Sequence, residues 1–390
     1  MLISKFTTYL TIIISLINPL KVNADQIASS AFPMIMYAVP GNDKSFQEVK
    51  SLGINYVHLY GLSRNSPSQS GFEKIKNYLD LANKYGLKVM LDLDGNELIK
   101  GNNVKKMQDI VEAFKYHPAL GYWYLSDEPD NKGITSSQLL PYYQMIKKES
   151  PNIPIVVCHA WTKNWYKFNN VQDIILHDIY PVTGETFPNS KLNHQTDFTF
   201  AAINSSKGKH VIPVLQFFNW KSGVNSKSQK TLKGFSVNKL RYPTFEEFRF
   251  LCFSTIAQGV NGLAFYSFAR NKMINSNWIN EVASPILKEV VTFTNKVKGE
   301  KMQFKDLSNK NSGFILSEWS NGSAKVYILV NSTNTKKSID IYKIAGIKPS
   351  NLKLIQNLNQ RNANLNIQGN SIIADVKPWE VLIFETNISD

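Results

Sequence analysis

The sequence predicts an α/β fold, a (β/α)8 TIM barrel, followed by a small all-β sandwich domain. Eight apolar, strand-like runs alternate with segments of helix length across about 265 residues, which is the size expected for such a barrel. Gly or Pro precedes many of these strands and supplies the turn out of the preceding helix. After about residue 305 the helical periods stop, and short strands alternate with turns, as in a sandwich.

The strands of the barrel are expected at 33–38, 54–60, 87–93, 120–125, 153–159, 173–179, 211–217 and 262–268. The helices are expected at about 43–52, 71–85, 103–116, 136–150, a weak 162–170, 195–207, 244–258 and 279–297. A doubly wound sheet is the rival fold, but it would need a Gly-rich phosphate loop after the first strand. The segment Val39-Pro-Gly-Asn-Asp43 is not such a loop.

The C-terminal strands are expected at 313–319, 324–330, 338–342, 351–356, 371–376 and 379–385. Asn-Gly at 321–322 predicts a hairpin between the first two of them. The predicted domains are a barrel over 25–300 and a β-sandwich over 301–390.

Residues 1–24 are predicted to be a signal peptide. Lys5 precedes an apolar run over 6–20, and Val22-Asn-Ala24 provides a small-residue cleavage site. An anchoring helix is the alternative, but the run is shorter than the roughly 20 residues that a membrane span needs. The sequence therefore predicts a secreted or periplasmic protein, with no membrane span in the mature chain.

The formal net charge of +14 favours acidic partners, an anionic glycan among them. A solvated basic surface is the alternative, and no nucleic-acid motif accompanies the charge. Cys158 and Cys252 are too few for a disulfide framework and are expected to be separate buried thiols. No His/Asp/Glu spacing matches a metal site, so neither a metal nor a cofactor is expected. We expect a monomer.

The most informative segment is Ser126-Asp127-Glu128-Pro129, where two adjacent carboxylates end the fourth predicted strand. Acids at the carboxyl end of a strand lie where barrels of this class keep their active sites. A solvated acidic turn is the alternative. If the predicted register holds, strand-end residues from the whole barrel converge on the same mouth.

Carboxylates and aromatic side chains dominate this predicted mouth. Such a composition suits an oligo- or polysaccharide, because aromatic rings stack on sugar C–H faces and carboxyls do acid–base chemistry on the glycosidic oxygen. Any single aromatic residue could equally be core packing. The candidate substrate-binding residues are Tyr37, His58, Tyr60, Asp94, His159, Trp161, Tyr180, Gln216, Trp220 and Tyr266.

The chain resembles clan A glycoside hydrolases, whose fourth strand usually ends in Asn-Glu-Pro. The resemblance rests on Asp127-Glu128-Pro129, on His177-Asp-Ile-Tyr-Pro181, and on Tyr242-Pro-Thr-Phe-Glu-Glu247 leading into Gly259-Val-Asn-Gly-Leu-Ala-Phe-Tyr266. It covers about residues 31–298 as architecture. It implies a glycoside hydrolase with Glu128 as the general acid/base.

Two positions depart from the clan A pattern. Asp127 stands in place of the Asn, and Gln216 occupies the strand-seven position that should hold the nucleophilic Glu. Three explanations stay open. Another acid at the mouth, Asp178 or Asp94, replaces the missing carboxylate; Asp127 and Glu128 act as a substrate-assisted pair, as in hexosaminidases; or the protein binds glycan without cleaving it. The candidate catalytic residues are Glu128, Asp178 and Asp127.

Two further features have structural alternatives to a role in the site. Thr244-Phe-Glu-Glu247 fits a capping box, so Glu247 is expected to cap a helix rather than to act on substrate. The Lys-rich stretch 219–242 leaves the active-site face and is long enough to be a lid or substrate-binding segment. Its basic side chains are candidates for contact with an acidic glycan, and a solvated loop is the alternative.

Overall fold

The computed structural model of the chain describes residues 32–64, 66–160, 164–188, 191–224, 231–274, 276–298, 303–308, 312–321, 325–346, 352–355, 365–368 and 371–386. The predicted signal peptide, residues 1–24, lies outside these ranges. Within them, no helix has both the length and the apolar character needed to cross a bilayer.

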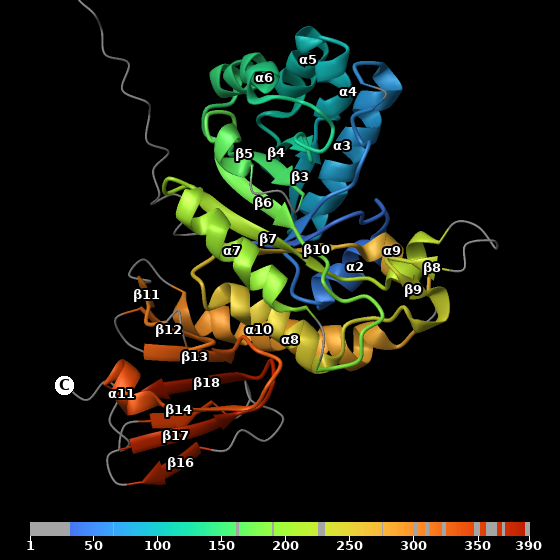
Figure 1. Ribbon diagram of the computed structural model, residues 1–390. Helices are drawn as coiled ribbons and strands as arrows, with labels where there is room; N and C mark the ends of the chain where they lie inside the picture. The colour runs from blue at the N-terminus through green and yellow to red at the C-terminus, as the bar shows by residue number, and fades with distance from the viewer. Residues whose placement is uncertain are drawn as a thin grey trace, which may run out of the picture.

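Eight parallel strands close into a barrel, which confirms the predicted fold class (Figure 1). They follow the chain order around the ring, and β1 closes it against β10. The strands are β1 (Met34–Met36), β2 (Tyr56–Val57), β3 (Lys88–Asp92), β4 (Leu120–Asp127), β5 (Ile155–His159), β6 (Ile174–Asp178), β7 (His210–Gln216) and β10 (Leu263–Tyr266). Because all eight run the same way, their carboxyl ends share one mouth.

Helices and short helical turns cover the outside of the barrel. They are α2 (Asp43–Ser51), α3 (Gln69–Lys84), α4 (Gly95–Lys100), α5 (Val104–Phe114), α6 (Ser136–Glu149), η1 (Trp165–Phe168), α7 (Asn193–Ser205), η2 (Trp220–Gly223), η3 (Val237–Lys239), α8 (Phe245–Ile256), α9 (Phe268–Lys272), η4 (Ile279–Ala283) and α10 (Ser284–Val297). The hairpin β8 (Thr231–Leu232) and β9 (Phe235–Ser236) lies between η2 and η3. The predicted capping box of α8 is present, with Thr244 Oγ1 accepting the N–H of Glu247.

Two local predictions are wrong, and one helix was not predicted. The eighth barrel strand ends at Tyr266 rather than at residue 268, because Ser267 accepts the N–H of Arg270 and caps the short helix α9. The weak helix expected over 162–170 is the single 3-10 turn η1. Helix α4 was not predicted. It begins at Gly95, where a Cβ atom would lie 1.7 Å from the Leu125 carbonyl oxygen, so the chain approaches β4 too closely for any side chain there.

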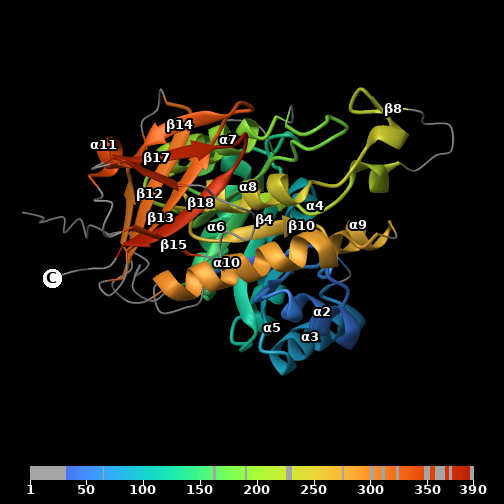
Figure 2. The same cartoon turned by 90° about the horizontal axis from the view of Figure 1, so that it is seen from below.

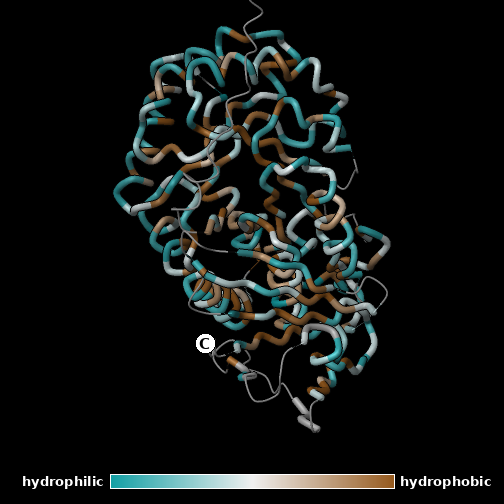
Figure 3. Tube along the Cα trace, turned by 90° about the vertical axis from the view of Figure 1, so that its left-hand side faces the viewer, coloured by the Kyte–Doolittle hydropathy of each residue, from teal (hydrophilic) through white to brown (hydrophobic). Residues whose placement is uncertain are grey.

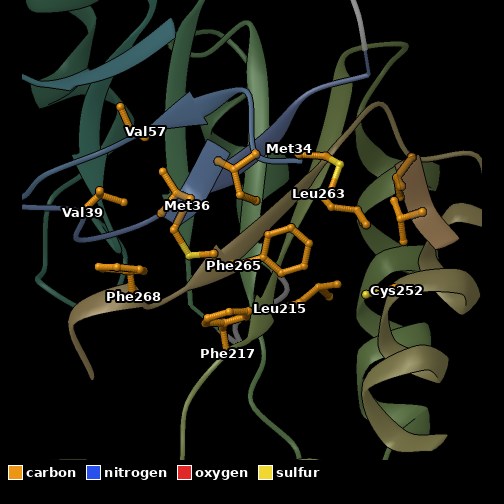
Figure 4. Packing of buried hydrophobic residues seen from close by; sticks show 14 of the residues in the cluster. Met34, Met36, Val39, Val57, Leu215, Phe217, Cys252, Leu263, Phe265 and Phe268 are labelled. Atoms are coloured by element: carbon orange, nitrogen blue, oxygen red, sulfur yellow. The ribbon is translucent and has the colours of Figure 1, made fainter. Parts of the chain in front are cut away.

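Side-chain alternation divides the apolar residues of the barrel into two clusters. One face of each strand fills the interior, as with Ile35, Val156 and Leu176, and the other face packs against the helices. Figure 4 shows part of the outer layer, with Leu215 and Phe265 on the strands beside the α8 helix that carries Cys252. Cys158 and Cys252 are buried free thiols, as predicted.

Two antiparallel sheets follow the barrel and form the predicted sandwich. The larger has the order β11-β12-β13-β18-β15 and the smaller β14-β17-β16. Their strands are β11 (Gln303–Asp306), β12 (Phe314–Ser320), β13 (Lys325–Asn331), β14 (Lys337–Asp340), β15 (Leu352–Leu354), β16 (Leu365–Gln368), β17 (Ser371–Val376) and β18 (Val381–Thr386), with helix α11 (Ile341–Ala345) after β14. Leu329 and Phe384 of one sheet share a core with Ile339 and Ala374 of the other.

The hairpin predicted from Asn-Gly is consistent with the pairing of β12 and β13, in which Ser320 lies opposite Lys325. The turn residues 322–324 lie outside the described residues. The predicted domain boundary, at residues 300 and 301, also lies outside them, between α10 and β11.

Helices α8 and α10 lie between the barrel and the sheets (Figures 1 and 2). Arg249 of α8 donates to Glu289 of α10 and to the carbonyl oxygen of Val381 in β18, each at 2.7 Å. The indole N–H of Trp379 donates to the Pro188 carbonyl oxygen at 2.6 Å. Figure 3 shows hydrophobic segments gathered in the interior of the molecule. These buried contacts attach the sandwich firmly to the barrel, on the outside of its wall.

Candidate active site

A cleft of about 420 Å³ opens at the carboxyl-terminal mouth of the barrel. It brings together seven of the residues that the sequence analysis selected, from five different strand ends and the segments that follow them. Its lining consists of Tyr60, Asp127, Glu128, Asp178, Tyr180, Trp220, Tyr266 and Arg270.

Glu128 directly follows the last residue of β4. Its N–H donates to the carbonyl oxygen of Cys158 in β5 at 2.7 Å, so the sheet still holds the backbone where the strand has ended. Its φ of 49° lies in the left-handed region, which is uncommon for a residue with a side chain. Residues held in this way cluster at active sites. The side-chain amide of Asn131 donates to Glu128 Oε2 at 3.3 Å.

Asp178 is the last residue of β6, and its carboxyl group lines the same cleft as that of Glu128. Part of its surface is open to the cleft, but protein atoms surround it on most sides. Burial raises the pKa of Asp178 well above its ordinary value, and the nearby negative charges of Glu128 and Asp127 act in the same direction.

The Oδ1 atom of Asp178 is buried and has no hydrogen-bond partner among the described residues. A buried carboxylate oxygen usually accepts at least one hydrogen bond, so an exception calls for an explanation. This geometry is consistent with an oxygen that accepts a hydrogen bond only when a ligand is bound in the cleft.

Asp127 is held differently from the other two acids. Its carboxylate accepts the Tyr124 hydroxyl at 2.6 Å and the Lys132 ammonium at 3.0 Å. The Tyr60 hydroxyl lies 3.5 Å away. These partners fix the position of the Asp127 side chain beside Glu128 and Asp178.

Aromatic rings form the remaining walls of the cleft. The ring of Tyr180 stacks on Tyr266, with 5.5 Å between centroids, and meets the edge of Trp220 at 6.2 Å. Tyr60 is 36% exposed. Rings with open faces beside carboxyl groups suit a pyranose ring, whose C–H face is apolar and whose rim is polar.

A second, more polar cavity of about 270 Å³ shares Tyr60 and Asp127 with the cleft. Asp94 lies here, 3.8 Å from the Arg64 guanidinium, and not in the cleft that contains Glu128 and Asp178. Burial raises the pKa of neighbouring Asp92 to about 6. Of the two acids considered as the missing carboxylate, Asp178 therefore has the matching position.

Four predicted substrate-binding residues do not line either cavity and are corrected. Tyr37, His58, His159 and Gln216 are each at most 1% exposed. Tyr37, His58 and Gln216 point into the barrel, but one layer below the cleft floor. His159 faces the opposite way, into the layer between strands and helices. There its Nε2 hydrogen-bonds with Oε1 of Gln172, which follows η1 in the chain. Trp161 lies outside the described residues.

The amide of Gln216 ties the end of β7 to the chain that follows β6. Its Nε2 donates to the carbonyl oxygens of Val182 and Phe218 at 2.8 and 3.1 Å, and its Oε1 accepts the N–H of Val182 at 3.0 Å. The Gln216 side chain therefore stabilises the backbone of these two segments. A carboxylate in its place would set one oxygen against the two carbonyl oxygens, while its other oxygen could still accept the Val182 N–H.

We therefore predict that Gln216→Glu does not create a nucleophile and instead destabilises the protein by about 1–3 kcal/mol, the cost of leaving buried polar groups without partners. Thermal or urea unfolding measures this loss, and Gln216→Met, which keeps the volume, is the control for amide loss alone. A stable Gln216→Glu variant with raised activity would contradict the assignment.

Arg270, Arg64 and Lys132 line these cavities but were not singled out from the sequence. Arg270 was missed because the eighth strand was expected to run to residue 268, which hides the short helix α9. Ser267 is a good N-cap and was the signal available. In the Lys-rich stretch 219–242, Arg241 forms an ion pair with Glu247, so its charge is already matched within the protein. Across the described ranges, no group of three or more His, Cys, Asp or Glu is arranged to hold a metal ion.

The fold is shared with solved glycoside hydrolases. A structure described as a glycoside hydrolase aligns with a TM-score of 0.62 at 11% identity, over 92% of this chain and 93% of that one. A glycoside hydrolase family 5 protein from Bacteroides vulgatus gives 0.61 at 11% identity, over 91% and 89%. An alpha-amylase from Geobacillus thermoleovorans gives 0.58 at 8% identity, over 92% and 98%.

At these identities the likeness shows the fold alone. The resemblance noted in the sequence is thus confirmed as architecture: the chain has the eight-stranded barrel of clan A-type glycoside hydrolases. No family model matches the chain, and no curated protein sequence matches it.

Proposed function

We propose that this protein is an exported glycoside hydrolase that cleaves O-glycosidic bonds, with Glu128 as the general acid/base and Asp178 as its partner carboxylate. The observation that carries the proposal is the presence of these two carboxyl groups, from the ends of β4 and β6, in one aromatic-lined cleft at the barrel mouth. Glycosidases need two carboxyl groups flanking the scissile bond. The signal-like residues 1–24 motivate export.

The closeness of the pair favours a retaining mechanism. An inverting enzyme keeps its carboxyl groups about 6.5–9.5 Å apart to admit a water molecule, whereas a retaining one has them at about 5–5.5 Å. The carboxyl group of Asp178 lies near enough to that of Glu128 for the two to interact strongly, which fits the shorter separation. Asp178 is therefore the nucleophile of the proposed reaction.

A proton on Glu128 serves the first step. Glu128 donates it to the glycosidic oxygen while Asp178 attacks the anomeric carbon, so the leaving group departs neutral and a glycosyl ester forms. Glu128, now a carboxylate, then takes a proton from water as that water attacks the ester. Asp127, anchored by Tyr124 and Lys132, supplies a fixed negative charge beside the developing oxocarbenium ion.

Binding without cleavage is the alternative from another class, motivated by the amide at Gln216. Turnover decides between the two. A panel of aryl glycosides and plant, bacterial and animal glycans is incubated with the wild-type chain and with Glu128→Gln. Release of reducing ends by the wild type alone supports the hydrolase. Binding of a glycan with no release across the panel supports the binding protein.

The raised pKa of Asp178 also predicts a pH profile. Because of it, the pair keeps a proton to higher pH than an ordinary carboxyl group would. Activity is lost as pH rises through that value, when the acid is no longer protonated. Asp127→Asn removes one of the charges that raise the pKa, so the alkaline limb of kcat/KM should move to lower pH. A limb that stays in place would contradict the proposed coupling.

A further inference from the structure

Arg270 is a cation in the cleft that the reaction above does not use. It lies on α9, four residues after the end of β10, and lines the same cavity as Glu128 and Asp178. The cleft therefore has an acidic part, formed by β4 and β6, and a basic part, formed by α9.

The segment 218–223, which follows β7, holds this guanidinium in place. Its central carbon lies 4.3 Å from the ring centroid of Phe218, a cation–π contact. Its Nε donates to Ser222 Oγ at 3.0 Å. Gly223 passes so close that a Cβ atom there would lie 2.3 Å from an Nη of Arg270, so a larger residue at this position would displace the guanidinium. The guanidinium thus occupies a fixed site with several N–H groups still available.

The charge of Arg270 is not matched by the protein. Each of the other three arginines in the described residues pairs with a carboxylate: Arg64 with Asp94, Arg241 with Glu247, and Arg249 with Glu289. Within the same ranges, no carboxylate lies within ion-pair distance of Arg270. A fixed, partly buried guanidinium without an anion is suited to bind a planar or tetrahedral anion through parallel hydrogen bonds.

We propose that the natural substrate is a glycan carrying a carboxylate or sulfate group, which binds to Arg270. This inference rests on the proposed function and identifies its substrate class. The anion can lie only at this end of the cleft, because the Glu128–Asp178 pair and Asp127 repel it elsewhere. In the second cavity, Arg64 and Lys132 are engaged by Asp94 and Asp127, and the third cation, Lys100, shares the cavity with Asp92 and Glu97. The net charge of +14 favours the approach of polyanions.

Calorimetric binding to a Glu128→Gln chain tests this separately from turnover. The probes are uronic acid oligosaccharides with their carboxyl-reduced counterparts, and sulfated galactan oligosaccharides with their desulfated counterparts. At least one anionic probe should bind about tenfold to a hundredfold more tightly than its neutral counterpart, as expected for charge-assisted hydrogen bonds. Which pair shows the difference tells carboxylate from sulfate.

Three variants in that background complete the test. Arg270→Gln should remove the difference, and Gly223→Ala should reduce it by displacing the guanidinium. Lys272→Gln is the matched control: it removes the same charge from the same helix, but Lys272 pairs with Glu48 outside the cleft, so the preference should persist. Melting temperatures confirm that each variant is folded.

The inference is overturned if no anionic probe binds, if neutral counterparts bind equally well, or if Lys272→Gln abolishes the preference as fully as Arg270→Gln. Turnover by the wild-type chain is measured beside binding. Cleavage of neutral glycans with no anionic preference would refute the inference and leave the hydrolase intact. Arg270-dependent anion binding without cleavage of any probe would instead refute the hydrolase.

Discussion

Replacing Glu128 by Gln is expected to lower the turnover of glycosides with poor leaving groups by about 10²–10⁴-fold, with the fold unchanged. The amide can fill the same space, but it has no proton to give to the glycosidic oxygen. The measurement is kcat on the substrate that the panel identifies, for wild type and variant side by side.

The leaving group provides the internal control for Glu128. An activated aryl leaving group departs as a stable phenolate and needs little protonation, so its release should suffer much less than that of an alkyl or sugar leaving group. Equal losses on both substrates would indicate misfolding or lost binding rather than a missing acid. Wild-type turnover of the poor leaving group would eliminate Glu128 as the general acid.

Removing the carboxyl group of Asp178 is expected to cost at least as much as Glu128→Gln, because no glycosyl ester can then form. Asp178→Ala opens space on the face of the sugar where the carboxylate would attack. Azide can enter that space and react in its place, so added azide should restore turnover of an activated glycoside and yield a glycosyl azide. Product analysis by mass spectrometry and NMR detects it.

Asp127→Ala is the control that separates the remaining mechanisms. If Asp178→Ala retains near-normal rates, while Asp127→Ala abolishes activity on N-acetylated sugars alone, the enzyme is substrate-assisted and Asp178 is a positioning residue. The present geometry speaks against this, because both oxygens of the Asp127 carboxylate already have partners, Tyr124 and Lys132.

The barrel was predictable because its strands are buried on both faces. Continuous apolar runs such as Val211–Phe217, bounded by turn residues, leave little choice between strand and loop. The ends of the strands were less certain. At the eighth strand, Phe268 is apolar enough to continue the run, and only the capping of α9 by Ser267 ends it.

The acids of the site were predictable for a simple reason: in a parallel barrel a carboxylate at a strand end has a cleft to enter. Which neighbours share that cleft was harder to predict. One residue of register decides whether a side chain points inward, as Asp178 does, or into the helix layer, as His159 does. Depth is also invisible in the sequence, so Tyr37 and His58 were placed in the cleft, although both are buried and pack against the ring of Tyr60, which lines it.

Gln216 shows where the resemblance to clan A ends. The resemblance to clan A indicated that a nucleophile is missing on β7, so a catalytically inert protein was one of the alternatives. In the structure this amide stabilises the backbone, and Asp178 at the end of β6 places another carboxyl group in the cleft with Glu128. An amide at the expected position therefore does not by itself argue against catalysis.

The most direct test of the Glu128–Asp178 pair is covalent trapping. A 2-deoxy-2-fluoro glycoside with a good leaving group, built on the sugar that the panel identifies, slows hydrolysis of the glycosyl ester so that it accumulates. Peptide mapping by mass spectrometry then locates the added sugar. The label is predicted on the peptide that contains Asp178. A label on any other carboxylate, or hydrolysis of the compound with no adduct at any time, would contradict the mechanism proposed for this cleft.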